Sequence, residues 1–375
     1  MPISKSIGNI VEDKLFIYQI LIFALFLSLI GCAASKDKIT DYTPAVVTEE
    51  YLRNLAENRK FLIGTATRND FWEIEKIYAE TLEREFNILT PENQMKWQFI
   101  HPMRYAYDWN QADQQVDFAD AHNMKVHGHT LVWHAQNPRW LLNENFNKVE
   151  MIEILRDHIY SVVGRYKGRI VLWDVVNEGI EGDSLRSTIW LNTIGPEYID
   201  LAFQFAHEAD PNAILIYNDF GISTVNSKSS SVYCLVKDML GRKVPIHGVG
   251  FQMHIKVDEI DYQSFANNMQ RFADLGLHIY VTELDVRIED DSDYSLKGQA
   301  LVYHNILKQC LSQSACKALQ MWGFTDKYSW IPVSFRGYGW ALPFDAYYNP
   351  KPAYYALKKA LQRNMSRIPL PLLDK

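Results

Sequence analysis

The sequence lacks several features that would indicate common functions. Acidic residues outnumber basic ones by 45 to 38, and the net charge of −7 removes the electrostatic reason for binding nucleic acid. No Gly/Ser-rich linker, low-complexity segment or internal repeat divides the chain. The turn after the first apolar run, residues 64–67, reads Gly-Thr-Ala-Thr and is no glycine-rich phosphate loop, which disfavours a nucleotide-binding sheet.

Hydrophobic and aromatic residues are abundant by contrast. Hydrophobic residues make up 47% of the chain, enough to bury a full core, so a disordered protein is excluded. All 10 Trp lie beyond residue 70. Several of them are expected to be ordinary core or surface residues. So many Trp on a weakly acidic chain also suit a neutral ligand with flat apolar faces, such as a sugar.

The N-terminal segment predicts export. Residues 15–30 form an apolar run that is short for a transmembrane helix and fits the core of a signal peptide. The run ends in Gly31-Cys32, which resembles the bacterial lipobox. We therefore expect residues 1–31 to be a lipoprotein signal peptide, Cys32 to carry the lipid, and residues 32–49 to be a polar tether. The alternative is an ordinary signal anchor that contains a Cys. A lipoprotein would contact the membrane through its anchor, in the bacterial cell envelope, facing the periplasm or the cell surface.

Cysteine is rare, with 4 residues in the chain. An exported protein lies where disulfides persist. Cys310 and Cys316 are close enough in sequence to form a bridge, although two buried thiols fit the spacing equally well. Cys234 lies in an apolar helical stretch and is predicted to be a core thiol.

From about residue 60 the chain alternates short apolar runs with longer amphipathic stretches. Eight strand candidates begin at Phe61, Phe86, Lys125, Ile170, Ile214, Val249, His278 and Ala318. Most are almost continuously apolar, which is typical of parallel strands covered on both faces. The intervals leave room for a helix after each strand. The pattern predicts an α/β fold, one (β/α)8 TIM barrel over residues 50–365, with residues 366–375 as a tail. The structural rival is an open, doubly wound sheet.

Polar and aromatic residues gather where these strands end, which is where a barrel of this kind carries its chemistry. They include two carboxylates, Glu178 and Glu283, each in an apolar strand. Burying a carboxylate is costly, so these acids are expected to have partners or a function. Two carboxylates that face each other across a cleft are the apparatus of glycoside cleavage, in which one protonates the leaving oxygen and the other attacks the anomeric carbon or directs water.

The motifs at the strand ends carry a family resemblance. They read TPENQMKW, GHTLVWH, WDVVNE, YND, QMH, VTELDV, WGFTDKYSW and FDAYYNPKPAYYAL. With them the chain resembles the glycoside hydrolase family 10 endo-β-1,4-xylanases over roughly residues 50–362. The resemblance implies retaining endo-hydrolysis of xylan by double displacement, with xylan and xylo-oligosaccharides as ligands. It implies a monomer without metal or cofactor.

The resemblance also implies a role for each matching residue. Glu178 would be the acid/base and Glu283 the nucleophile. Asn177 would bind the sugar 2-hydroxyl, and His254, held by Asp285, would orient Glu283. The expected substrate-binding residues are Glu92, Asn93, Lys96, His134, Gln136, Trp140, Tyr217, Asn218, Gln252, Trp322 and Trp330. Some family members bridge the cysteines before the last strand, which favours a Cys310–Cys316 disulfide.

The sequence departs from the family pattern at two places. His127 stands where the family commonly has Arg, and Phe220-Gly221 stands where it commonly has Tyr-Asn. Phe220 keeps the ring and loses a hydroxyl, while Gly221 removes a side chain on the expected leaving-group side. We therefore expect aglycone binding to differ from the family pattern, and hydrolysis to be preserved.

The sequence also has features of three other functions. His127, His129 and His134 have the H-x-H spacing of some metal-dependent hydrolases, but no further strand-end His and Asp complete a coordination shell. A non-catalytic sugar-binding lipoprotein is disfavoured because Glu178 and Glu283 are both present. An endoglucanase or a mannanase on a similar barrel remains the nearest alternative.

Overall fold

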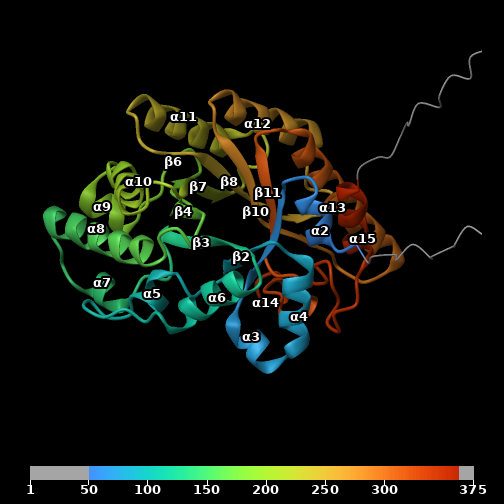
Figure 1. The fold of residues 1–375 in the computed structure, drawn as a ribbon. Coiled ribbons are helices and arrows are strands. Elements are labelled where there is room, and N and C mark those ends of the chain that lie inside the picture. Colours follow the sequence, from blue (N-terminus) through green and yellow to red (C-terminus); the bar gives the residue numbers. More distant parts are fainter. Residues whose placement is uncertain (1–49, 363–375) are drawn as a thin grey trace, which may run out of the picture. The chain divides into compact units, whose positions relative to one another are not determined.

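Eight parallel strands close into a barrel in the computed structural model, which describes residues 50–362 (Figure 1). The strands are β1 (Leu62–Thr67), β2 (Ile88–Pro91), β3 (Lys125–Val132), β4 (Leu172–Asn177), β7 (Ile214–Phe220), β8 (Gly248–Gln252), β10 (His278–Arg287) and β11 (Cys316–Met321). Strand β11 pairs with both β10 and β1, so the sheet has no free edge. This closure confirms the predicted (β/α)8 barrel and excludes the open sheet. Each strand begins within about two residues of its predicted start.

Three short strands were not predicted. They are β5 (Ile180–Glu181), β6 (Ser184–Leu185) and β9 (His254–Lys256). Strands β5 and β6 form a small antiparallel hairpin directly after β4. Strand β9 pairs with the end of β10, so that His254 lies opposite Asp285. This pairing extends one wall of the barrel at the end where the candidate residues lie.

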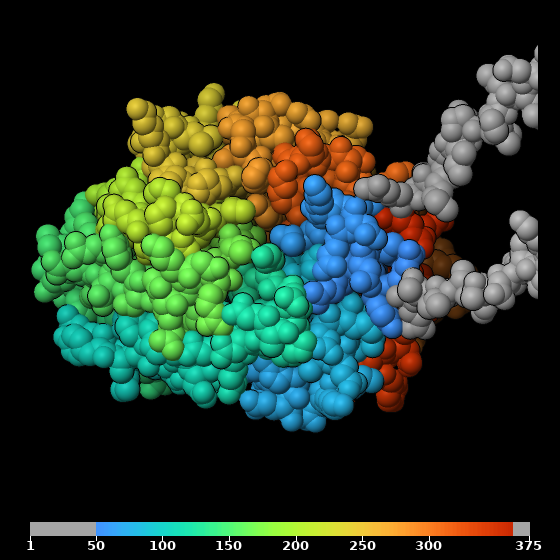
Figure 2. Space-filling model, viewed as in Figure 1, coloured from blue at the N-terminus to red at the C-terminus, as the bar shows by residue number. Residues whose placement is uncertain are grey.

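Helices surround the barrel, and in Figure 2 those from α8 (green) to α12 (orange) cover the surface in chain order. The α-helices are α2 (Leu52–Glu57), α3 (Asn69–Ile74), α4 (Lys76–Glu85), α5 (Trp97–Ile100), α6 (Asn110–Ala121), α7 (Arg139–Asn143), α8 (Lys148–Arg165), α9 (Ile189–Ile194), α10 (Tyr198–Ala209), α11 (Ser227–Gly241), α12 (Tyr262–Asp274), α13 (Asp293–Ser312), α14 (Ile331–Ser334) and α15 (Pro352–Leu361), with a 3-10 turn η1 (Asp326–Tyr328). Within residues 50–362, no helix is long and apolar enough to cross a membrane.

Helix α8 shows why these stretches become helices. Asn147 accepts hydrogen bonds from the backbone at the first turn, and Glu150 bonds back to Asn147, which forms a capping box. Leu155, Ile159 and Val162 follow at helical spacing and are fully buried. The local cap and the apolar stripe therefore favour the same helix.

The disulfide between Cys310 and Cys316 is present and joins the end of α13 to the start of β11. The prediction for Cys234 is wrong, because this thiol is exposed. Helix α11 buries Val232, Val236 and Met239 instead. Cys234 is two residues past Val232, on another side of the helix.

Several predictions concern segments outside the described residues. The signal peptide at 1–31, the lipidated Cys32, the tether at 32–49 and the tail at 366–375 all belong to this group. They stay predictions.

Candidate active site

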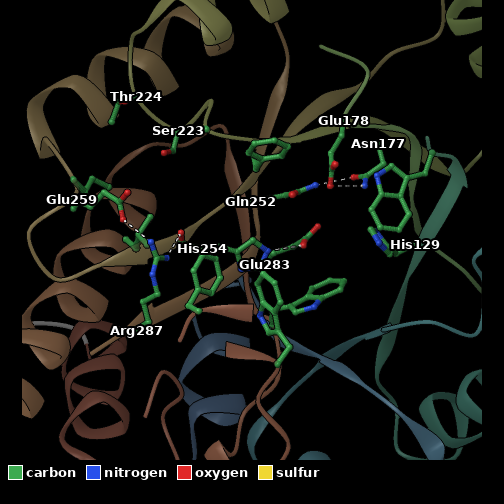
Figure 3. Close-up of a pocket in the computed structure, with 18 of the residues that line it drawn as sticks. His129, Asn177, Glu178, Ser223, Thr224, Gln252, His254, Glu259, Glu283 and Arg287 are labelled. Atoms are coloured by element: carbon green, nitrogen blue, oxygen red, sulfur yellow. Dashed lines mark hydrogen bonds and ion pairs between the residues drawn. The ribbon is translucent and has the colours of Figure 1, made fainter. Parts of the chain in front are cut away.

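A pocket of about 630 Å3 opens at the carboxyl ends of the strands (Figure 3). Nine of the predicted site residues line it, namely Glu92, Lys96, Asn177, Glu178, Gln252, His254, Glu283, Trp322 and Trp330. They come from six strands or the loops that follow them, namely β2, β4, β8, β9, β10 and β11. The barrel therefore brings together residues that are far apart in sequence.

Glu178 directly follows the last residue of β4 and has a backbone φ of 57°. This left-handed conformation is unusual for Glu and turns the chain sharply as it leaves the strand. The backbone N–H of Glu178 donates to the carbonyl of Asn218 at 2.8 Å, which holds the turn in place. The Asn177 amide lies 3.3 Å from Oε1, and His134 Nδ1 lies 3.7 Å from Oε2. Figure 3 shows the carboxyl groups of Glu178 and Glu283 in one pocket.

Glu283 lies within β10, with 5% of its surface exposed. Each carboxylate oxygen has its own partner. Asn218 Nδ2 donates to Oε1 at 2.8 Å, and His254 Nε2 lies 3.1 Å from Oε2. Two donors from different strands therefore fix the orientation of this carboxylate, as a positioned nucleophile requires.

His254 bridges two carboxylates. Its Nδ1 lies 2.7 Å from Asp285 Oδ2, and its Nε2 faces Glu283. Burial alone would lower the pKa of His254, but the charge and hydrogen bond of Asp285, together with Glu283, raise it to about 10. The imidazole is then a cation that donates from both nitrogens. Trp330 Nε1 also donates to Asp285 Oδ2 at 2.9 Å, which fixes the second carboxylate.

Amide side chains connect the two glutamates. Asn218 Nδ2 lies 2.9 Å from Asn177 Oδ1, and Gln252 Nε2 donates to the same oxygen at 2.9 Å. Because Asn177 Oδ1 is occupied, its Nδ2 is left to face Glu178 and the pocket. Thr282 Oγ1 donates to Asn218 Oδ1 at 2.8 Å and sets the amide orientation. Gly250 makes room for this amide, since a Cβ there would lie 2.3 Å from Asn218 Oδ1.

A buried histidine pair contacts Asp174, and one of the two, His129, lines the pocket. Asp174 Oδ2 is 2.7 Å from His129 Nδ1, and Asp174 Oδ1 is 2.9 Å from His127 Nε2. Burial would raise the pKa of Asp174, but the two histidines lower it. Gln320 Nε2 donates to His127 Nδ1 at 2.8 Å, so the ring proton of His127 is on Nε2, facing Asp174. His127, which departs from the family pattern, is therefore part of the buried network.

The metal hypothesis meets a specific obstacle here. Ligand atoms of His129, Asp174 and Glu283 lie within 4.8 Å of one another. Asn218 Nδ2, however, lies 3.3 Å from Asp174 Oδ2 and 2.8 Å from Glu283 Oε1. An N–H donor thus occupies the position that a shared cation would need. His134, from the predicted trio, lies beside Glu178 and not in this cluster. A cation shared by Asp174 and Glu283 does not fit beside this amide N–H.

One part of the pocket combines charged groups with indole faces. Asn93 Nδ2 donates to Glu92 Oε1 at 3.0 Å, and Lys96 Nζ donates to Asn93 Oδ1 at 3.1 Å. Burial raises the pKa of Glu92 and lowers that of Lys96. Lys96 Nζ lies 5.0 Å from the ring centroid of Trp133. Hydrogen-bonding groups beside flat apolar rings match a sugar, which has hydroxyl edges and apolar faces.

A second part of the pocket contains the departure at Phe220-Gly221. The Phe220 ring is 42% exposed, and Lys228 Nζ lies 3.5 Å from its centroid. Lys228 also donates to Asp219 Oδ1 at 2.7 Å, so the cation holds the ring from a fixed position. Gly221 has a φ of 67°, and the only neighbour of a Cβ there would be Lys228 Cδ at 4.0 Å. The ring surface expected on the leaving-group side is present, with open space beside it.

The structure does not bring every predicted residue to the pocket. Tyr217 is fully buried and donates to Asp219 Oδ2 at 2.7 Å, so it supports Asp219 instead of meeting a ligand. Trp140 lies on α7, packs against Trp97 and donates its indole N–H to the His101 carbonyl. The predicted residues that do not line the pocket are Asn93, His134, Gln136, Trp140, Tyr217, Asn218 and Asp285. Of these, Asn93, His134, Asn218 and Asp285 contact residues that do.

Other lining residues were not predicted as binding residues. They are His129, Trp133, Phe220, Gly221, Ser223, Thr224, Asn226, Ile255, Glu259, Ile260, Arg287 and Phe335. Trp133 lies beside His134 in the GHTLVWH motif, which is a signal that identifies it. The loop residues carry no motif. Figure 3 shows Ser223, Thr224 and Glu259 at the end of the pocket opposite His129.

Comparisons with known proteins agree with one another. The family model for glycosyl hydrolase family 10 matches residues 51–360. Endo-1,4-beta-xylanase B of Thermotoga neapolitana is 49% identical over 348 residues, which span 91% of this chain and 98% of that protein. The native xylanase 10B of Thermotoga maritima is 52% identical with a TM-score of 0.82, over 83% of this chain and 98% of that one. Xylanase 10B of Thermotoga petrophila RKU-1, solved in complex with xylobiose, is 51% identical with a TM-score of 0.82. The match covers 84% of this chain and 98% of that one.

The replacement Asp285→Asn should lower the pKa of His254 from about 10 toward the ordinary value of about 6.5, because it removes the charge that stabilises the imidazolium. Since the folded pKa is raised, the charged pair stabilises the wild-type fold fully below about pH 6.5 and loses this effect as pH rises through about 10. NMR titration of the labelled imidazole measures both pKa values. Glu289→Gln removes one charge just past the end of β10, four residues after Asp285, and is the control. A wild-type His254 that titrates near 6.5 would contradict this account.

Proposed function

The chain belongs to glycosyl hydrolase family 10, and from that premise we propose that it hydrolyses internal β-1,4-xylosidic bonds of xylan with retention of configuration. The proposal is supported by the relatives, which are named endo-1,4-beta-xylanases. The single observation that carries it is the placement of Glu283. Its two oxygens are fixed by Asn218 and His254, in the pocket that also holds Glu178.

In the first step, Glu283 attacks the anomeric carbon while Glu178 gives its proton to the departing glycosidic oxygen. The bond from carbon to the glycosidic oxygen breaks, and an ester to Glu283 forms. Asn177 Nδ2 faces the pocket and donates to the sugar 2-hydroxyl, a contact that strengthens in the transition state. The cationic His254 holds the carboxylate in position for the attack.

In the second step, water hydrolyses the ester. Glu283 carries no negative charge while it is esterified, so Glu178 can now hold the negative charge that follows loss of its proton. Glu178 takes a proton from water, and the hydroxyl attacks the anomeric carbon from the side that the leaving group vacated. Glu283 is released as a carboxylate, and both glutamates return to their starting states.

The substrate class is tested by incubating the protein with xylan, glucan and mannan side by side. We expect reducing sugar to be released mainly from xylan, because the ligand bound by the solved relative is xylobiose. Glu283→Ala is the blank. Equal or greater release from glucan or mannan would favour the endoglucanase or mannanase alternative. No release from any polymer would favour a non-catalytic sugar-binding protein.

The roles of the two glutamates are separated by the leaving group. Glu178→Ala should leave the first step on an aryl xylobioside nearly intact, since an aryl group leaves without protonation. A glycosyl-enzyme should then accumulate, and azide, which needs no base, should restore turnover. Glu283→Ala should lower the rate on both aryl and polymeric substrates by about 10⁴-fold or more, about 5 kcal/mol in barrier. Burst kinetics of both variants, with and without azide, measure the rates of the first and second steps separately. Equal losses on both substrates for Glu178→Ala, without rescue, would mean that another residue is the acid/base.

We also propose that the protein is anchored in the bacterial cell envelope by lipid on Cys32. The support is the apolar run before Gly31-Cys32 and the polar stretch after it. Cys32→Ala should abolish partitioning into detergent and leave hydrolysis of soluble xylan unchanged, because the anchor lies outside the catalytic domain. Cys234→Ala is the matched control and should still partition. A mature N-terminus well downstream of Cys32 would disprove the anchor.

A further inference from the structure

A second cavity lies behind the loop that borders the catalytic pocket. It has a volume of about 610 Å3, similar to the catalytic pocket. The loop Trp330–Trp340 forms a shared wall. Trp330 and Phe335 line the catalytic pocket, whereas Pro332, Tyr338 and Trp340 line the second cavity. Helix α14, at the start of this loop, is labelled in Figure 1.

The second cavity has aromatic side chains at its edge. Trp340 is 39% exposed and Tyr347 is 82% exposed, and both line the cavity. Large aromatic side chains are usually buried against the core or against one another, so two exposed rings in one cavity are a feature of binding surfaces. The third ring, Tyr338, is partly buried and donates its hydroxyl to Glu289 at 3.0 Å.

The backbone holds Trp340 in this position at a cost. Its φ is 42°, in the left-handed region that bulky residues seldom adopt. The Trp340 carbonyl accepts hydrogen bonds from two buried side chains, Gln299 Nε2 and Lys351 Nζ, the latter at 2.6 Å. Lys351 is itself fixed by an ion pair with Asp326 at 2.7 Å. Strain of this kind persists only where the surroundings impose it, and here the two buried donors hold the Trp340 carbonyl in place.

The polar groups of the cavity restrict what it can bind. Three carboxylates line it, from Asp291, Asp326 and Asp345, against the single cation of Lys351. Because Lys351 is paired with Asp326, the remaining charge is negative and disfavours nucleic acid, phosphate or an acidic peptide. Carboxylates accept hydrogen bonds from hydroxyl groups, and aromatic rings pack against apolar ring faces. A neutral polyhydroxylated ring meets both requirements.

We propose that this cavity is a second saccharide-binding site, which holds a segment of xylan away from the bond being cleaved. The inference rests on the proposed function, because a polymeric substrate can occupy both sides of the Trp330–Trp340 loop. Each additional contact with the same polymer raises the effective concentration of substrate at the catalytic pocket. The site should therefore matter for long or insoluble xylan and not for a substrate that fills only the catalytic pocket.

The test uses Trp340→Ala and Tyr347→Ala, with Tyr105→Ala as the control, an 88% exposed Tyr that does not line the cavity. Binding to insoluble xylan is measured by depletion, in a Glu283→Gln background that prevents hydrolysis. Each cavity variant should weaken binding about five-fold, within the range of one aromatic contact. Hydrolysis of an aryl xylobioside by the same variants with Glu283 intact should stay within about two-fold of the parent. The control should match the parent in both assays.

Each outcome separates this site from the proposed function. Tyr347 is mostly exposed, so its truncation leaves the fold intact and tests the site even if Trp340→Ala misfolds. Unchanged xylan binding in both cavity variants would overturn the second site, whatever the enzyme hydrolyses. If the parent binds xylan and loses binding in these variants but cleaves no xylan, the site stands and the proposed function fails. Loss of aryl xylobioside hydrolysis by Tyr347→Ala would also overturn the inference, because the cavity would then act through the catalytic pocket.

Discussion

The active site depends on one buried amide, that of Asn218. Its Nδ2 lies within hydrogen-bonding distance of both Asn177 and Glu283, and its Oδ1 is fixed by Thr282. The side chain is fully buried, so none of these bonds competes with water. Such an amide orients Glu283, the proposed nucleophile, together with Asn177, which lies beside the proposed acid/base Glu178. The Asn218 amide can occupy this position because residue 250 is a glycine. A side chain at Gly250 would collide with the amide and displace it.

The charges around this amide explain why several acids are stable in a small volume. Glu283 and Asp285 share the cationic His254, whose pKa is raised to about 10. Asp174 lies between His127 and His129. Removing one member of such a group leaves an uncompensated buried charge, which is far more costly than replacing the whole group. The two proposed catalytic carboxylates are thus embedded in a network that positions them and limits their repulsion.

The strands were predictable because each is a short, almost continuously apolar run, a signal that local sequence carries by itself. Glu178 and Glu283 were predictable for a related reason, since a carboxylate in such a run is conspicuous. The wrong predictions concern the direction in which a side chain points from its helix. Cys234 is in a helix as predicted, but the phase of the buried stripe places it outside. Trp140 comes six residues after the motif that ends in His134, yet α7 turns it toward Trp97. Arg287 and Phe335 were missed because their contact, 4.3 Å from cation to ring, joins the end of β10 to the residue that follows α14, which are distant in sequence.

The account predicts that Glu283 forms a covalent bond to the sugar, and the stereochemistry of the first product tests this most directly. Proton NMR of a xylo-oligosaccharide digest, recorded before the anomers equilibrate, shows which anomer is released. Double displacement predicts that the β-anomer, the configuration of the cleaved bond, appears first. Initial release of the α-anomer would show that water attacks in a single step, and would contradict the role assigned to Glu283.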